Sequence, residues 1–170
     1  MELIEIAQLV TGIATLIVAS VLIWQMFIQK KTLDIAHNDA DANVSLMAMD
    51  TRARTNEWFA ENCSPEMIDK FDKGLNSLSK KEFMIIESYF RSTMRVLGTE
   101  WRLGRLTDFK PYYKNTFFAE LRFDHKLFRE YWLDNWYKTM NLSDTYTGLA
   151  ELGKEAYEES SGEKIGDSNE

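Results

Sequence analysis

The sequence predicts an all-α protein in which an N-terminal transmembrane helix precedes a small helical-bundle domain. One observation is an uncharged stretch of 23 residues, from Ile6 to Ile28. A second is the recurrence of apolar residues at spacings of three and four, and a third is that only two prolines and almost no β-branched alternation occur. About 140 residues follow the stretch, which is the usual size of one domain.

The uncharged stretch has the length of a membrane span. At about 1.5 Å per residue it reaches roughly 34 Å, enough to cross a bilayer core of about 30 Å. Trp24 and Phe27 lie near its C-terminal end, where aromatic rings favour the headgroup level. A buried core helix rarely needs so long an uncharged run, and a cleavable signal peptide begins with positive charge rather than Glu2 and Glu5. We therefore interpret residues 1–29 as a retained anchor in the lipid bilayer.

Basic residues predict the orientation of this span. Lys30 and Lys31 follow it directly, and no basic side chain precedes it. The positive-inside rule then places the N-terminus outside and the C-terminal region in the cytoplasm, at the cytoplasmic (inner) membrane. The lone Cys63 fits a reducing compartment. A formal net charge of −7 argues against nucleic-acid binding.

Residues 30–63 are expected to form a juxtamembrane helix or stalk. Neither proline nor glycine occurs between Gly12 and Cys63, so the membrane helix can continue as one helix of roughly 55 to 60 residues. A heptad seam of four-three spacing runs through it, formed by Leu33, His37, Ala40, Val44, Met47, Thr51, Arg54 and Trp58. Several of these residues are polar or small, whereas coiled coils prefer larger apolar ones. Coiled-coil dimerisation, packing within the chain and a partly solvated stalk all remain open.

Residues 64–159 are expected to form the cytoplasmic helical domain. Ser64 and Pro65 begin its first helix, which continues through Leu75. The capping box at 79–82 opens the clearest helix, which Gly104 ends. Its apolar stripe is Phe83, Ile86, Phe90, Met94, Leu97 and Trp101. We expect Phe90, Leu97 and Trp101 to be buried.

Three further helices complete the expected domain. Thr107 and Asp108 start one, Asp124 caps the next, and residues 143–144 begin the last. The middle one carries the aromatic residues Tyr131, Trp132, Trp136 and Tyr137. A cluster at helical spacing is more often core than interface, and both interpretations remain open. Residues 160–170 consist mainly of Ser, Gly, Glu, Lys and Asp, with nothing to bury, and are expected to form a disordered acidic tail.

Three segments carry a resemblance to known proteins: 78–83, 100–106 and 129–132, reading LSKKEF, EWRLGRL and REYW. In this pattern the chain resembles a diffuse group of bacterial single-pass membrane-anchored helical proteins of unknown function. The resemblance implies the anchored architecture and a bacterial origin. It brings no activity with it.

The spacing of candidate ligands predicts no metal, cofactor or catalytic site. Di-iron bundles need Glu-x-x-His pairs, and neither His37 nor His125 has a glutamate three residues earlier. A calcium-loop template aligned at Asp39 places Val44 where the sharp turn needs glycine. Cys63 precedes a helix start that could lower its thiol pKa, but no partner base is indicated. We therefore expect a protein that is not an enzyme.

Two carboxylates in the clearest helix are candidates for structural ion pairs. Glu87 is four residues before Arg91, and Glu100 lies between Arg95 and Arg105. Unaccompanied carboxylates on helices usually hold neighbouring helices together, so we favour this role over that of catalytic acids.

The strongest interaction signal lies within the span. Ala7, Thr11, Thr15 and Ala19 form a ladder of small residues with Gly12 beside it. Small ladders let helices approach closely in lipid, although such residues are also common in spans generally.

The leading functional hypothesis follows from these patterns. It is a non-enzymatic single-pass membrane protein whose helical domain mediates protein–protein interaction or assembly, with other membrane proteins or with itself through the span. The alternative is a membrane-anchored sensor or regulator that binds a small ligand in an aromatic-lined helical pocket.

Overall fold

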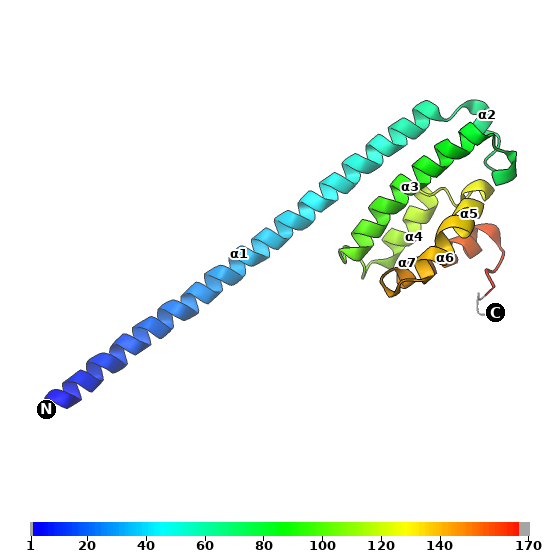
Figure 1. Ribbon diagram of the computed structural model, residues 1–170. Helices are drawn as coiled ribbons and strands as arrows, with labels where there is room; N and C mark the ends of the chain where they lie inside the picture. Colours follow the sequence, from blue (N-terminus) through cyan, green and yellow to red (C-terminus); the bar gives the residue numbers. More distant parts are fainter. Residues whose placement is uncertain (1, 167–170) are drawn as a thin grey trace. The chain divides into compact units, whose positions relative to one another are not determined.

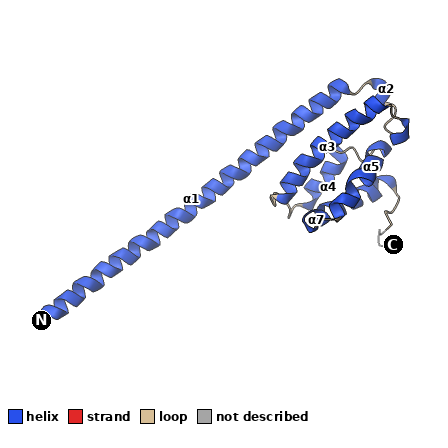
Figure 2. Ribbon diagram, in the orientation of Figure 1, coloured by secondary structure: helices blue, strands red, loops and turns tan. Residues whose placement is uncertain are grey.

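The computed structural model describes residues 2–166, and within that range every regular element is a helix (Figures 1 and 2). The α-helices are α1 (Leu3–Asn62), α2 (Pro65–Ile68), α3 (Lys80–Arg102), α4 (Lys110–Ala119), α5 (Lys126–Trp132), α6 (Lys138–Asn141) and α7 (Asp144–Ser161). A 3₁₀ turn, η1 (Leu75–Ser77), precedes α3, and a π-helical turn, η2 (Leu133–Tyr137), joins α5 to α6. The predicted all-α class, with a long apolar N-terminal helix before a smaller helical domain, is confirmed.

The chain divides into two compact units, residues 1–45 and 46–170. The first unit is the N-terminal part of α1. By length and composition alone, α1 is long and apolar enough to cross a membrane, and none of its apolar window is buried. The helix is uninterrupted from Leu3 to Asn62, as the absence of proline predicts.

The second unit begins at Leu46 rather than near residue 64, where the domain was expected to start. The last turns of α1 therefore belong to the helical domain. Phe59 is buried in its core, with its ring 4.2 Å from that of Tyr89. The seam residues Met47 and Trp58 are exposed instead, because the packed face is the one carrying Ala48 and Phe59.

Helix α3 is the centre of the domain. Ser79 and Glu82 form the expected capping box, in which the backbone N–H of Ser79 donates to Glu82 Oε2 at 2.6 Å. Phe90 and Leu97 are fully buried, as the stripe predicts. Trp101 is only half-buried, because it lies at the end of the domain where its Nε1 donates to the Thr145 carbonyl at 2.8 Å.

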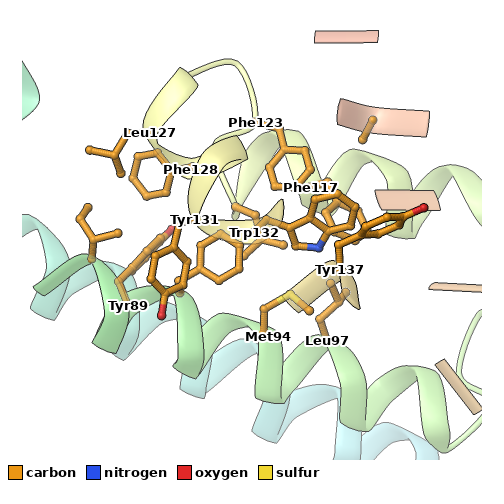
Figure 3. Close-up of a cluster of buried hydrophobic side chains, with 14 of the residues drawn as sticks. Tyr89, Met94, Leu97, Phe117, Phe123, Leu127, Phe128, Tyr131, Trp132 and Tyr137 are labelled. Carbon is orange, nitrogen blue, oxygen red and sulfur yellow. The ribbon is translucent and has the colours of Figure 1, made fainter. Parts of the chain in front are cut away.

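The core is largely aromatic (Figure 3). The Trp132 ring is fully buried, and its centroid lies 5.3 Å from that of Phe123 and 5.0 Å from that of Tyr137. Tyr131 is buried as well. Of the aromatic cluster that the sequence left open, these three residues are therefore core, and only Trp136 is half-buried.

Three helix boundaries differ from the sequence expectation. The helix beginning at Pro65 ends at Ile68, because the chain then turns through residues 69–73 and the Phe71 carbonyl accepts from the Leu127 N–H at 2.8 Å. Helix α4 begins at Lys110, since residues 103–108 form turns. Helix α5 has His125, not Asp124, as its N-cap.

The expected disordered tail is partly wrong. Helix α7 continues to Ser161 and ends at Gly162, whose φ of 72° is the left-handed conformation that favours glycine. Beyond it, Ile165 packs against the core and its N–H donates to Glu158 Oε1 at 3.1 Å. The Ile165 side chain and this hydrogen bond thus connect the segment after α7 to the domain, and residues 167–170 lie outside the described range.

Candidate functional site

A half-open groove in the helical domain is the most site-like feature of the described residues. It has a volume of about 500 Å³ and lies between the C-terminal half of α3 and the segment from η2 to the start of α7. Its lining comprises Met94, Arg95, Gly98, Thr99, Arg102, Trp136, Thr139, Met140, Ser143, Tyr146 and Leu149. Drug-sized ligands bind in cavities of roughly 300–1,000 Å³ with mostly apolar linings, so this groove has the size and character of a small-molecule site.

Local structure gives the groove its apolar floor. Met94, Met140 and Leu149 are all buried, and they come from three different helices. Trp136 enters the lining from η2, where the helix widens to the π form that often marks functional sites. The aromatic side chain that the sequence could assign to core or interface is therefore a wall of the groove.

Gly98 keeps the groove open on the α3 side. A Cβ added at this position would lie 3.5 Å from Tyr146 Cε1, which is an ordinary van der Waals contact. An alanine thus fits there, whereas a longer side chain would meet Tyr146, which also lines the groove. Position 98 can therefore be used to fill the site without backbone strain.

Two arginines of α3 line the same groove. Arg95 and Arg102 are exposed, and neither has a hydrogen-bond or ion-pair partner within the part of the chain that the structure describes. They are separated by seven residues, two helical turns or about 10 Å, so both lie on one face of α3. Thr99 lies between them on that face and also lines the groove.

Glu100 lies on another face of α3, in a buried polar cluster. Its carboxylate is 1% exposed and accepts hydrogen bonds from Arg52 of α1 and from Arg105. The Tyr112 hydroxyl contacts both carboxylate oxygens, at 3.2 and 3.3 Å. Arg52 also donates to this hydroxyl at 2.7 Å. The cluster joins α1, α3 and α4, which is the structural role that the sequence favours for Glu100.

The other predicted ion pair is present at the surface. Arg91 Nη2 donates to Glu87 Oε1 at 2.6 Å. Both side chains are substantially exposed, so the pair contributes little to stability. Glu87 and Glu100 both belong to α3, but Glu87 forms a surface ion pair and Glu100 a buried one.

The other sequence candidates are placed as follows. Burial raises the pKa of the Cys63 thiol, the direction opposite to the activation that a helix start could have produced. Residues 39–50, the calcium-loop template, are helical throughout. In the described residues, no three His, Cys, Asp or Glu side chains gather in a way that could hold a metal ion.

The small-residue ladder lies along the exposed apolar part of α1. The Thr11 hydroxyl donates to the Ala7 carbonyl, and the Thr15 hydroxyl to the Thr11 carbonyl, each at 2.9 Å. Both hydroxyls are thus satisfied within the helix. Gly12 has no neighbour that an added Cβ would meet, and Ala19 is exposed.

Sequence reasoning missed the arginines of the groove. A signal was present, because no carboxylate stands three or four residues before or after Arg95 or Arg102, while Arg91 has Glu87 at that spacing. The sequence could not show which residues face these arginines across the groove, because that wall comes from η2, α6 and α7.

The chain was compared with protein-family models, curated proteins and solved structures, and none of them matches it. The resemblance to bacterial membrane-anchored helical proteins therefore stays a prediction.

Proposed function

We propose that this chain is a single-pass membrane protein whose helical domain binds a small ligand in the α3–α7 groove. The observation that carries the proposal is the groove of about 500 Å³, with buried Met94, Met140 and Leu149 as its floor and Trp136 as a wall. A mostly apolar concavity with a few polar groups is the usual form of a small-molecule site. The groove therefore favours the alternative hypothesis from the sequence, a membrane-anchored sensor or regulator that binds a small ligand.

The membrane part of the proposal rests on the apolar stretch of α1. In a core helix of a water-soluble domain such a stretch would be buried, whereas its apolar side chains are exposed along the whole window. Placing these residues in lipid removes that apolar surface from water. Lys30 and Lys31 at the C-terminal flank of the span support an anchor in the inner membrane with the helical domain on its cytoplasmic side.

Ligand binding is tested on the full-length protein purified from membranes. Small molecules released by denaturation are compared, by mass spectrometry, between the wild type and Gly98→Leu, which adds a bulky side chain at a position that lines the groove. We expect at least one compound that is present with the wild type and depleted with the variant. Identical profiles, with both proteins folded by circular dichroism, would contradict the proposal.

Membrane topology is tested separately with reporters fused after Glu170. A fluorescent protein that folds only in the cytoplasm should be bright, and alkaline phosphatase should be inactive in a bacterial host. Glu2→Lys combined with Glu5→Arg moves positive charge to the other flank and should weaken or invert this orientation. Active phosphatase on the wild-type chain would refute the orientation.

Self-association through the span is a second candidate, favoured by the ladder of Ala7, Thr11, Thr15 and Ala19. Because the threonine hydroxyls are bonded to the helix's own carbonyls, the face that a second helix would meet is small and carries no unsatisfied donor. Association of this kind would set the oligomeric state of a membrane receptor without involving the groove.

A further inference from the structure

We propose that the groove takes a free anionic amphiphile, a small molecule with an apolar body and one phosphate group held by Arg95 and Arg102. This inference rests on the proposed function, because it names the class of ligand for the same groove.

Arg95 and Arg102 themselves favour an anionic ligand. The chain has eight arginines, and the other six each have a described contact. Only Arg95 and Arg102 lack a partner among the described residues, and both line the groove. A guanidinium presents five donors in a planar fork that matches phosphate oxygens, so two such groups at one groove favour an anion.

The charges of the other groove residues also favour an anionic ligand. None of the groove-lining residues is acidic, although the chain as a whole carries a formal net charge of −7. On the α7 side, Asp144 directly follows Ser143 and disfavours an anion there. The anionic group is therefore assigned to the α3 wall, where the Thr99 hydroxyl lies between the two arginines.

The number of hydrogen-bond donors at the α3 wall favours a phosphate over a carboxylate. Arg95 and Arg102 stand about 10 Å apart along α3. An anionic group that binds both side chains therefore lies between them, near Thr99. A phosphate group offers three acceptor oxygens, whereas a carboxylate offers two. Three oxygens can accept hydrogen bonds from both guanidinium groups and from the Thr99 hydroxyl.

The rest of the lining specifies an apolar body. Trp136, Met140 and Leu149 offer an aromatic face and flexible or branched apolar side chains. The volume of about 500 Å³ lies within the small-molecule range. We therefore assign a free compound rather than a phospholipid of the bilayer.

The test uses the full-length chain in phosphatidylcholine nanodiscs and octyl phosphate as the probe. Binding is measured by equilibrium dialysis, with empty nanodiscs subtracting partition into lipid. We expect saturable binding that Arg95→Gln and Arg102→Gln each weaken about tenfold, which corresponds to about 1.4 kcal/mol, because each variant removes a charged hydrogen-bond donor to the anion. Arg91→Gln, on the same helix but paired with Glu87 outside the groove, should change affinity less than twofold.

Two further probes and one further variant fix the class of ligand. Octyltrimethylammonium should not bind the groove, and inorganic phosphate should bind far more weakly than octyl phosphate. Gly98→Leu should abolish binding without lowering helix content, because leucine is a better helix former than glycine. Octyl phosphate binding that Gly98→Leu leaves intact would overturn the inference.

The remaining outcomes separate this inference from the proposed function. If Gly98→Leu abolishes binding but the arginine variants do not, or if octyltrimethylammonium binds equally well, the groove is a ligand site without anion selectivity. If phosphatidic acid placed in the nanodisc displaces octyl phosphate, the occupant is a bilayer lipid. Each result overturns the assignment of a free anionic amphiphile, and the first leaves the proposed ligand-binding function standing.

Discussion

Arg52 in α1 and Glu100 in α3 form an ion pair across 48 positions of sequence, and the Glu100 carboxylate in this pair is 1% exposed. Arg105 binds the other oxygen of the same carboxylate. One buried acid thus holds two guanidinium groups. Removing it would leave two cations in a site with little access to water.

We therefore expect Glu100→Ala to destabilise the domain by about 3–5 kcal/mol, the usual effect of breaking a buried pair. The measurement is chemical unfolding of the full-length protein in detergent micelles. Arg54→Ala is the matched control, because Arg54 pairs with Asp50 on the same helix but both side chains are well exposed. That variant should change stability by less than about 0.5 kcal/mol. Equal effects of the two would show that Glu100 is not the anchor of α1.

The free energy of unfolding of the domain should decrease at acidic pH, because Glu82 becomes protonated there. The Lys70 ammonium and the Ser79 N–H and hydroxyl lower the pKa of Glu82 to about 2. Because the folded-state pKa lies below the unfolded value of about 4.3, the contribution is complete above about pH 5 and is lost as pH falls towards 2. Glu82→Gln should flatten this part of the stability curve. A curve of unchanged slope would contradict the assignment.

Adding one methyl group at Gly153 should be strongly unfavourable. A Cβ there would lie 2.6 Å from Trp132 Cζ2 and 2.9 Å from two atoms of the Phe117 ring. Gly153→Ala should cost about 1–3 kcal/mol, because the rings of the core must move to accept it. Gly98→Ala is the control, because the added Cβ makes only an ordinary van der Waals contact. Since alanine is a better helix former than glycine, this variant should stabilise the domain by up to about 1 kcal/mol. Thermal melts of the two variants should shift in opposite directions.

The apolar stripe of α3 should show graded effects. Phe90 is fully buried, so Phe90→Ala should cost about 3–5 kcal/mol. Trp101 is half-buried, and Trp101→Ala should cost less than Phe90→Ala despite the larger side chain. Unfolding titrations of both variants measure the difference. The reverse order would show that Trp101 is the more important core residue.

Association through the span is tested with a transmembrane-association reporter. Thr11→Leu and Thr15→Leu place bulk on the small ladder while raising hydrophobicity, so the signal should fall without loss of insertion. Val10→Leu and Val18→Leu alter other faces of the same helix and should keep the signal. Equal signals from all four variants would remove the ladder as a contact surface.

The sequence by itself determined the elements whose causes are local. The uninterrupted α1 follows from the absence of proline, and the start of α3 follows from the Ser79–Glu82 capping box. The Glu87–Arg91 pair follows from a four-residue spacing. Each depends on neighbours within one or two helical turns, and such patterns are visible in a single sequence.

Tertiary structure decided everything that depends on distant residues. The Phe71 carbonyl bonds the Leu127 N–H, so the helix at Pro65 stops at Ile68 despite a continuing apolar pattern. Glu100 takes Arg52, 48 residues away, as a partner, and it does not take Arg95. Arg95 is left without a described partner beside a groove whose far wall comes from η2, α6 and α7. Periodicity identifies the face that a helix buries, but only packing selects what lies opposite that face.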